Sequence, residues 1–302
     1  MPLPVHPPPR SPLDRHRQLA PSASVRVSPL CLGAMNFGDA WKDNLGNAQR
    51  KRHSQFSIIS SITQRQNRDQ LVLASKFSSS YKSHESDKLQ STYGGNGGKS
   101  MRVSLELSLQ KLQTSYIHLF YLHCGKVIYL GISDYPAWVV AKANQYVRDH
   151  GLRQFSVYQG RFLRGFEREI LLMYRDENMG VVPVQGKGAE QSRAQRKTPS
   201  DGEKSVSKVL ETIANSKQTD LTSIDLAYVR HKAPYVFPVV GGRKVEHLRG
   251  NIAALDLSLS VEEMAQIEAA YPFDHGFPHT FLSGTLFDGS TPRTPDGPGA
   301  CG

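Results

Sequence analysis

Two side chains capable of acid–base or carbonyl chemistry lie at the ends of predicted buried strands. Lys76 lies at the end of QLVLASKF (70–77), and His123 ends YIHLFYLH (116–123). A lysine in such a place holds an anion or lowers a neighbour's pKa, and a histidine donates to a carbonyl oxygen. Alone, each also fits a structural role, as a lysine with a packed stem or a hydrogen-bonded core histidine. Together, at equivalent strand ends, they predict a catalytic pair.

Short polar side chains follow at two further strand ends. Ser133 is the last residue of the run KVIYLGIS, and Asp134 follows it directly. Gln159 ends FSVYQ. Hydroxyl, carboxylate and amide groups at one rim suit a polar planar ligand such as an amide. Ordinary turn chemistry at strand ends is the alternative interpretation.

A predicted anion site occupies VVGGRKVEHLRGN (239–251), where an apolar strand runs through two glycines into a helix. Gly241 and Gly242 allow backbone N–H groups to approach a ligand, and a helix N-terminus favours negative charge. Arg243 can clamp a phosphate through two parallel hydrogen bonds. A glycine turn with a solvated Arg243–Lys244 pair is the alternative.

The elements that position these residues alternate between strand and helix along most of the chain. The predicted strands are continuously apolar, which indicates burial on both faces and a parallel sheet. Helical periodicity predicts helices near 99–113, 136–151, 166–180, 204–216 and 221–232, another after Lys244, and a last one capped by Ser260 and Glu263. The number of repeats favours a (β/α)8 TIM barrel. A doubly wound sheet is the alternative, which the lack of GxGxxG after the first strand disfavours.

One junction conflicts with that pattern. Only Cys124 and Gly125 separate the apolar runs 116–123 and 126–133. Neighbouring parallel strands ordinarily need a crossover of about a dozen residues or more. The two runs therefore form an antiparallel hairpin, form one long strand, or have lost their crossover.

The composition fits one large domain. The chain has 302 residues, 38% of them hydrophobic. Its mean hydropathy is −0.43, and no apolar run approaches the ~20 residues that span a bilayer. We expect a disordered Pro-rich arm at 1–24, a barrel domain at 25–285 and a disordered tail at 286–302, with no secretory signal and no membrane partner.

Charge and cysteine usage narrow the function classes. The net charge is +10, but the basic residues form no single stripe with interleaved aromatic residues, so we expect no nucleic-acid partner. Three cysteines without CxxC or Cys/His spacing predict neither a zinc site nor a disulfide framework. A reducing, cytoplasmic compartment fits this usage.

Whole phrases of the chain resemble the aldo-keto reductase family, in its fungal norsolorinic acid reductase and aryl-alcohol dehydrogenase branch. They cover most of 25–285 and include RVSPLCLGAMNFGDAW, NRDQLVLASKF, YIHLFYLH, KVIYLGISDYPAWVVAKANQY, FSVYQGRF and FPVVGGRKVEHLRGNIAALDLSLS. The resemblance implies a (β/α)8 barrel that binds NADP(H) and passes hydride to the carbonyl carbon of a ketone or aldehyde. It also implies a tyrosine that protonates the oxygen, assisted by a lysine paired with an aspartate, and a histidine that orients the carbonyl.

The resemblance assigns roles residue by residue. Lys76 and His123 match the catalytic lysine and histidine, and Gly33, Met35 and Asn36 match the loop after the first barrel strand. Ser133, Asp134 and Gln159 match the contacts to the nicotinamide amide. The adenosine-phosphate segment is matched by Gly241, Gly242, Arg243, Lys244, His247 and Asn251.

The chain departs from the family at two places. The aspartate and tyrosine belong to a segment that corresponds to 44–66, which contains neither residue type. The helix that separates the histidine strand from KVIYLGIS is absent, and Cys124–Gly125 marks the join. These departures predict a decayed or mis-assembled copy, so the hypotheses are an active reductase, an NADP(H)-binding remnant without turnover, or a chain that does not fold.

Overall fold

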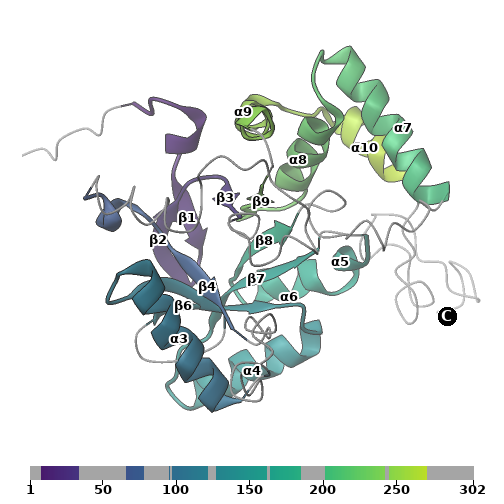
Figure 1. Cartoon of the computed structure of the whole chain (residues 1–302). Coiled ribbons are helices and arrows are strands. Elements are labelled where there is room, and N and C mark those ends of the chain that lie inside the picture. Colours follow the sequence, from purple (N-terminus) through teal and green to yellow (C-terminus); the bar gives the residue numbers. More distant parts are fainter. Residues whose placement is uncertain are drawn as a thin grey trace, which may run out of the picture.

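A curled parallel sheet forms the centre of the molecule (Figure 1). The computed structural model describes residues 8–33, 66–77, 95, 97–121, 127–161, 164–184, 201–241 and 245–270. The seven strands lie in the order β3-β9-β8-β7-β6-β5-β4, and every neighbouring pair is parallel. They are β3 (Cys31–Leu32), β4 (Ala74–Lys76), β5 (Ile117–Tyr121), β6 (Val127–Ser133), β7 (Phe155–Arg161), β8 (Gly180–Val184) and β9 (Val239–Val240).

This sheet is an incomplete (β/α)8 barrel, which confirms the predicted fold class. From β4 to β9 its strands follow chain order across the sheet, as in a barrel, whereas a doubly wound sheet reverses direction at a switch point. Within the described part of the chain, β3 and β4 are the two open edges.

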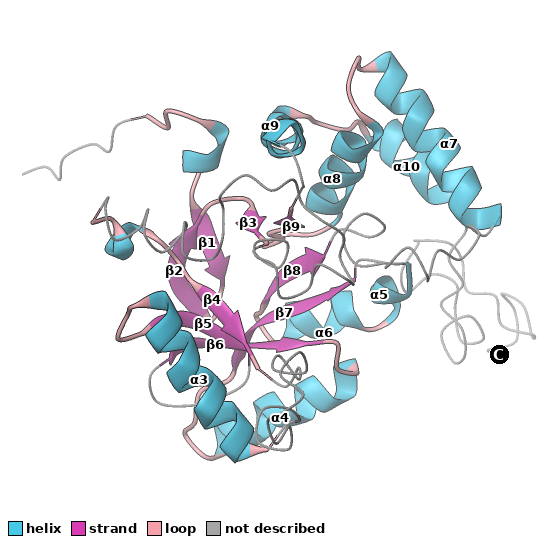
Figure 2. Cartoon of the chain, viewed as in Figure 1, coloured by secondary structure: helices cyan, strands magenta, loops and turns pink. Residues whose placement is uncertain are grey.

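Helices pack on the outside of the curled sheet (Figure 2). They are α3 (Gly98–Leu112), α4 (Ala137–Asp149), α5 (Arg164–Arg168), α6 (Ile170–Asp176), α7 (Asp201–Ser216), α8 (Leu221–Lys232), α9 (Val245–Ala253) and α10 (Val261–Ala269), with 3₁₀ turns η1 (Pro12–Asp14), η2 (Arg68–Gln70) and η5 (Ala254–Asp256). The predicted helix at 166–180 is two helices, α5 and α6. None of the described helices is long and apolar enough to cross a membrane.

The helix ends follow their sequence signals. Ser260 and Glu263 form the predicted capping box at the start of α10, with reciprocal hydrogen bonds of 3.2 and 2.8 Å. Gly151, just beyond α4, has a φ of +64°, which glycine adopts without steric cost.

The pairing of β5 and β6 decides among the three arrangements considered for the runs 116–123 and 126–133. The strands are parallel neighbours, with Ile117 opposite Val127 and Tyr121 opposite Gly131. The chain must therefore return about 13 Å along the sheet between residues 121 and 127. Six Cα–Cα steps reach at most about 21 Å, so the connection is possible but too short to contain a covering helix. The parallel pairing agrees with the third alternative, a shortened crossover, and outward-facing Ile128 of β6 is 38% exposed.

Two apolar layers flank the sheet. Leu130, Ile132 and Tyr158 face outward and pack with α4, α6, α7 and α8. Phe120 faces outward against α3 and stacks on Phe77, with ring centroids 5.8 Å apart. The alternate positions of the strands face the barrel interior, where Leu119, Tyr121, Val157, Val182 and Phe237 form a second cluster.

An antiparallel hairpin closes the N-terminal end of the barrel, and it corrects one expectation. Strands β1 (Arg17–Ala20) and β2 (Ala23–Val27) pair through a turn at Pro21–Ser22, so the predicted disordered arm at 1–24 is wrong for residues 17–24. Leu19, Ala20 and Ala23 are buried in the interior cluster. Because these few apolar residues pack onto the barrel, a segment with weak sequence signals becomes ordered. The boundaries 25–285 and 286–302 remain predictions.

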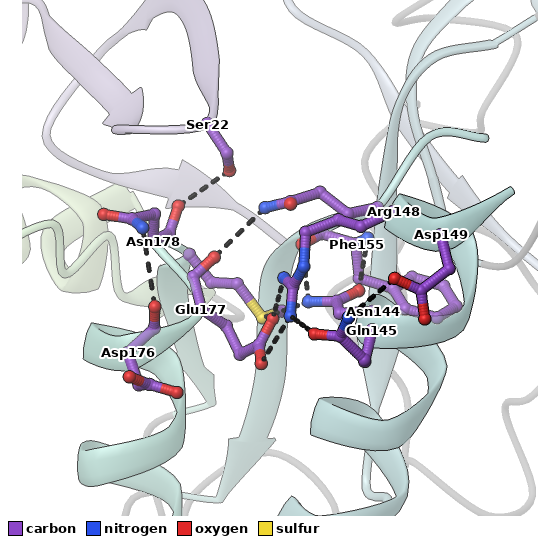
Figure 3. A network of polar contacts seen from close by, with 11 residues as sticks. Ser22, Asn144, Gln145, Arg148, Asp149, Phe155, Asp176, Glu177 and Asn178 are labelled. Atoms are coloured by element: carbon purple, nitrogen blue, oxygen red, sulfur yellow. Dashed lines mark hydrogen bonds and ion pairs between the residues drawn. The ribbon is translucent and has the colours of Figure 1, made fainter. Parts of the chain in front are cut away.

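A polar network ties the base of the sheet to α4 and α6 (Figure 3). The side chain of Asn144 on α4 accepts from Phe155 N at 2.8 Å and donates to Phe155 O at 3.4 Å. Its amide therefore pairs with both backbone groups of the first residue of β7. Glu177, 4% exposed, pairs with Arg148 through bonds of 2.6 and 3.3 Å. Ser22 of the hairpin turn donates to Asn178 O at 2.7 Å, which links the hairpin to the same corner.

Candidate active site

The carboxyl ends of the parallel strands form one rim, and three predicted site residues lie on it. Lys76 is the last residue of β4, and Ser133 is the last residue of β6. Ser133 is the register partner of Gln159 on β7. The sheet therefore brings Ser133 and Gln159 together. Lys76 lies two strands away from Ser133, on β4, where it is opposite Tyr121 of β5.

Lys76 faces the barrel interior. Its ammonium group lies 5.2 Å from the centre of the Tyr121 ring. Ser75, the preceding residue, points to the opposite side, where its hydroxyl lies 2.9 Å from Ser108 of α3. The alternation of side chains along a strand thus places Lys76 on the interior face of β4, where the residue is exposed.

Two further interior groups lie close to Lys76. Burial strongly raises the pKa of Tyr121, and nearby Cys31 raises it further. Burial also raises the pKa of the Cys31 thiol, while the charge of Lys76 opposes that shift. Both groups are therefore held in their neutral forms. Sequence reasoning missed Tyr121, although its inward register with Leu119 could have been read from the alternation of the strand.

The amide group of Gln159 is buried at the rim. The residue is 5% exposed, and its Oε1 has no hydrogen-bond partner among the described residues. The adjacent Ser133 hydroxyl donates to Asp134 Oδ2 at 2.8 Å. Asp134 leaves the strand in a left-handed conformation, φ 57°, and its N–H donates to Gln159 O at 3.1 Å. A buried, unpaired carbonyl oxygen is costly unless a ligand donor completes it.

The predicted phosphate segment is described in part. Gly241 directly follows β9 and is exposed. His247 and Asn251 lie one turn apart on α9, a helix without buried residues. His247 is exposed and Asn251 is half-buried. Gly242, Arg243 and Lys244 fall outside the described residues.

Other predicted residues also fall outside the described ranges. His123 lies two positions after the end of β5, and Met35 and Asn36 follow Gly33. Their roles remain predictions. Segment 44–66, with neither tyrosine nor aspartate, is outside the described residues except for Gln66.

Comparison with known proteins decides the family. The aldo/keto reductase family model matches residues 125–272. Norsolorinic acid reductase B of Dothistroma septosporum is 49% identical over 348 residues, covering 94% of this chain and 88% of that protein. The chain belongs to the aldo/keto reductase family. It is therefore related to oxidoreductases by sequence.

Other relatives of this aldo/keto reductase are similar over the same span. Norsolorinic acid reductase B of Aspergillus parasiticus is 45% identical over 93% of this chain and 90% of that protein. An aryl-alcohol dehydrogenase of Pestalotiopsis microspora is 42% identical over 91% of this chain and 87% of that protein.

The alignment with the Dothistroma protein is longer than the matched part of this chain. The alignment with the Dothistroma protein is 348 residues long, whereas 94% of this 302-residue chain is about 284 residues. About 64 alignment positions are therefore gaps in this chain, the difference between those two lengths. The chain therefore lacks internal segments that the Dothistroma protein has.

Proposed function

We propose that this aldo/keto reductase binds NADP(H) and reduces the carbonyl group of an aromatic or polyketide-like ketone or aldehyde in fungal secondary metabolism. The observation that carries the proposal is the buried Gln159 Oε1, which has no partner among the described residues and lies beside Ser133 on the rim. A carboxamide N–H would complete this oxygen, and the nicotinamide ring carries such a group. When bound, the cofactor supplies the hydride.

The chain's own residues would divide the remaining work. Gln159 accepts from the amide N–H, and the Ser133 hydroxyl lies next to it to fix the orientation of the ring. Lys76 brings a positive charge to the same rim, where negative charge develops on the carbonyl oxygen. His123 would donate a hydrogen bond to that oxygen, and Arg243, Lys244, His247 and Asn251 would hold the adenosine phosphate, assisted by the N-terminus of α9.

Proton delivery limits the proposed rate. Segment 44–66 lacks the tyrosine and aspartate that the family places there, and removing a general acid costs about 10²–10⁴-fold in rate. We therefore expect slow turnover in which water or another weak acid supplies the proton. The same observation favours a second candidate, an NADP(H)-binding protein without turnover.

Two measurements on the full chain separate these candidates. NADPH binding is followed by quenching of protein fluorescence, and turnover is followed by NADPH oxidation with norsolorinic acid and a series of aromatic aldehydes. Binding with slow, substrate-dependent oxidation supports the reductase, and binding without oxidation supports the second candidate. If NADPH does not bind a cooperatively folded chain, both proposals fail.

The matched variant is Gln159→Leu. It removes the unpaired oxygen and should weaken NADPH binding about tenfold, the effect of one lost hydrogen bond in a buried site. We also propose that the protein is cytoplasmic, because its cysteine pattern fits a reducing compartment. The dispersed basic charge does not favour a nucleic-acid partner, and we propose no membrane partner.

A further inference from the structure

Three arginines gather at the N-terminal end of the barrel, opposite the rim that carries Ser133 and Gln159. Arg17 begins β1, Arg15 lies two residues before it, and Arg230 lies in the last turn of α8, the helix that leads into β9. We call Arg15, Arg17 and Arg230 the basal arginine cluster. The proposed cofactor contacts use none of these residues.

Arg17 is held in place but is incompletely paired. Its Nη2 donates to Val236 O at 2.6 Å, and its guanidinium carbon lies 4.7 Å from the centre of the Phe237 ring. These contacts fix the plane of the guanidinium group. Its Nε is buried and has no hydrogen-bond partner within the described part of the chain.

Arg230 is also bonded to backbone carbonyl groups through its guanidinium group and is incompletely paired. Its Nη1 donates to Leu255 O at 3.2 Å and lies 3.5 Å from Ala254 O, both at the turn η5. Its Nε is also buried and lacks a partner among the residues that the structure describes. Two oriented guanidinium groups therefore each retain a buried N–H donor.

The charges in the cluster do not balance. Arg15 pairs with Asp256 at 2.7 Å, and the two side chains are 53% and 54% exposed. Burial lowers the pKa of Arg17, and burial followed by the charges of Arg17 and Arg15 lowers the pKa of Arg230, while Asp256 opposes that shift. Guanidinium groups stay protonated in proteins, so the cluster carries three positive charges. Among the described residues, the carboxylate that interacts with Arg15 and Arg230 is Asp256.

We propose that the basal arginine cluster binds a phosphate group carrying two negative charges. Two excess positive charges match that ligand, and unpaired N–H groups on fixed guanidinium planes suit phosphate oxygens. Arg15, half exposed and paired with Asp256, is the solvent-facing member of the cluster. The site lies at the opposite end of the barrel from the predicted adenosine-phosphate segment, so it is a separate site from that of NADP(H).

Phosphate-dependent stability of the full chain, without cofactor, tests this site. The melting temperature is measured in potassium phosphate and in potassium chloride of equal ionic strength, and ³¹P NMR line broadening reports binding directly. Glycerol 3-phosphate in a parallel series distinguishes free phosphate from a phosphomonoester. We expect a saturable rise in melting temperature with one or both phosphates and none with chloride.

Variants assign the effect to the cluster. Arg17→Met and Arg230→Met should each lower phosphate affinity at least about tenfold, the loss expected for one charge-assisted hydrogen bond. The matched control is Arg26→Met on the same hairpin, whose guanidinium group donates to His16 O at 2.9 Å, and it should leave affinity unchanged. Arg243→Met tests the other end of the barrel and should also leave this affinity unchanged.

Some results would overturn the proposal. Equal stabilisation by chloride, or a phosphate effect that survives in both Arg17→Met and Arg230→Met, excludes the basal arginine cluster as a phosphate site. If those variants do not fold, Arg15→Gln at the exposed side serves instead and should weaken phosphate binding in the NMR titration. Unchanged binding in a folded Arg15→Gln variant would then reject the site.

Discussion

The ammonium group of Lys76 lies over the ring of Tyr121, 5.2 Å from its centre. The two residues are register partners on neighbouring strands β4 and β5. This pairing brings a tyrosine next to the predicted catalytic lysine in a chain that lacks tyrosine in segment 44–66. It raises the question of whether Tyr121 replaces the missing proton donor.

Tyr121 should not be the proton donor. Burial raises its pKa strongly, whereas a general acid works best with a pKa near the working pH. We expect Tyr121→Phe to change kcat/KM for NADPH-dependent carbonyl reduction by less than about twofold. Lys76→Met should lower kcat/KM about 10–100-fold, because it removes the positive charge near the oxygen that becomes negative. A loss of 10²-fold or more in Tyr121→Phe would instead identify Tyr121 as the acid.

Gln159 and Asn144 provide a matched pair of buried amides. Gln159→Leu removes an unpaired oxygen, so the free energy of unfolding should stay equal or rise by up to about 1 kcal/mol. Asn144→Leu breaks two bonds to the backbone of Phe155 and should lower it by about 2–4 kcal/mol. Urea denaturation of both variants measures the contrast. Equal destabilisation would mean that Gln159 has a structural partner, which would remove the basis of the proposed amide contact.

Gly131 is required by the Tyr121 ring. A Cβ atom at this position of β6 would lie 2.7 Å from two ring carbons of Tyr121, and that ring is buried. Gly131→Ala should therefore lower the free energy of unfolding by about 1–3 kcal/mol. The same substitution in a Tyr121→Leu background should cost less, because the smaller side chain leaves space, and a double-mutant cycle measures this coupling. Gly98→Ala, where no atom lies within 4 Å, is the control and should not destabilise the chain.

His118 should make the β4 edge sensitive to acid. Its Nδ1 accepts from Leu73 N at 3.3 Å, its ring meets Tyr116 edge-on, and burial together with the charge of Arg68 lowers its pKa. The folded state therefore binds fewer protons than the unfolded state, whose histidine has a pKa of about 6.5. The stabilisation of the folded state by neutral His118 is complete above about pH 6.5. It is lost as the pH falls through the lowered pKa of His118.

The measurement is the melting temperature between neutral and mildly acidic pH, in wild type and in His118→Asn. The asparagine keeps an acceptor for Leu73 N but does not titrate, so its melting temperature should vary less with pH in this range. A wild-type slope that persists unchanged in His118→Asn would assign the pH dependence to another group.

Much of the site could be predicted from residue types alone. Lys76 and Ser133 lie at strand ends, as their positions after apolar runs predicted, and the Ser260–Glu263 cap is present. Gln159 lies two residues before the end of β7, which continues to Arg161. Such signals are local, since strand ends, caps and glycine turns depend on a few neighbouring residues. Family phrases added the assignment of roles, which residue spacing cannot supply.

Tertiary structure decided the features that depend on distant partners. The runs 116–123 and 126–133 allowed three arrangements, and only the sheet shows that they are parallel neighbours. The hairpin of β1 and β2 is ordered because Leu19, Ala20 and Ala23 enter the barrel interior, a contact that local sequence cannot indicate. The approach of Tyr121 to Lys76, and of Arg17 to Arg230, likewise arises from packing between segments far apart in the chain. Local sequence determined which residues end each element, and burial of apolar surface against remote elements determined which of them meet.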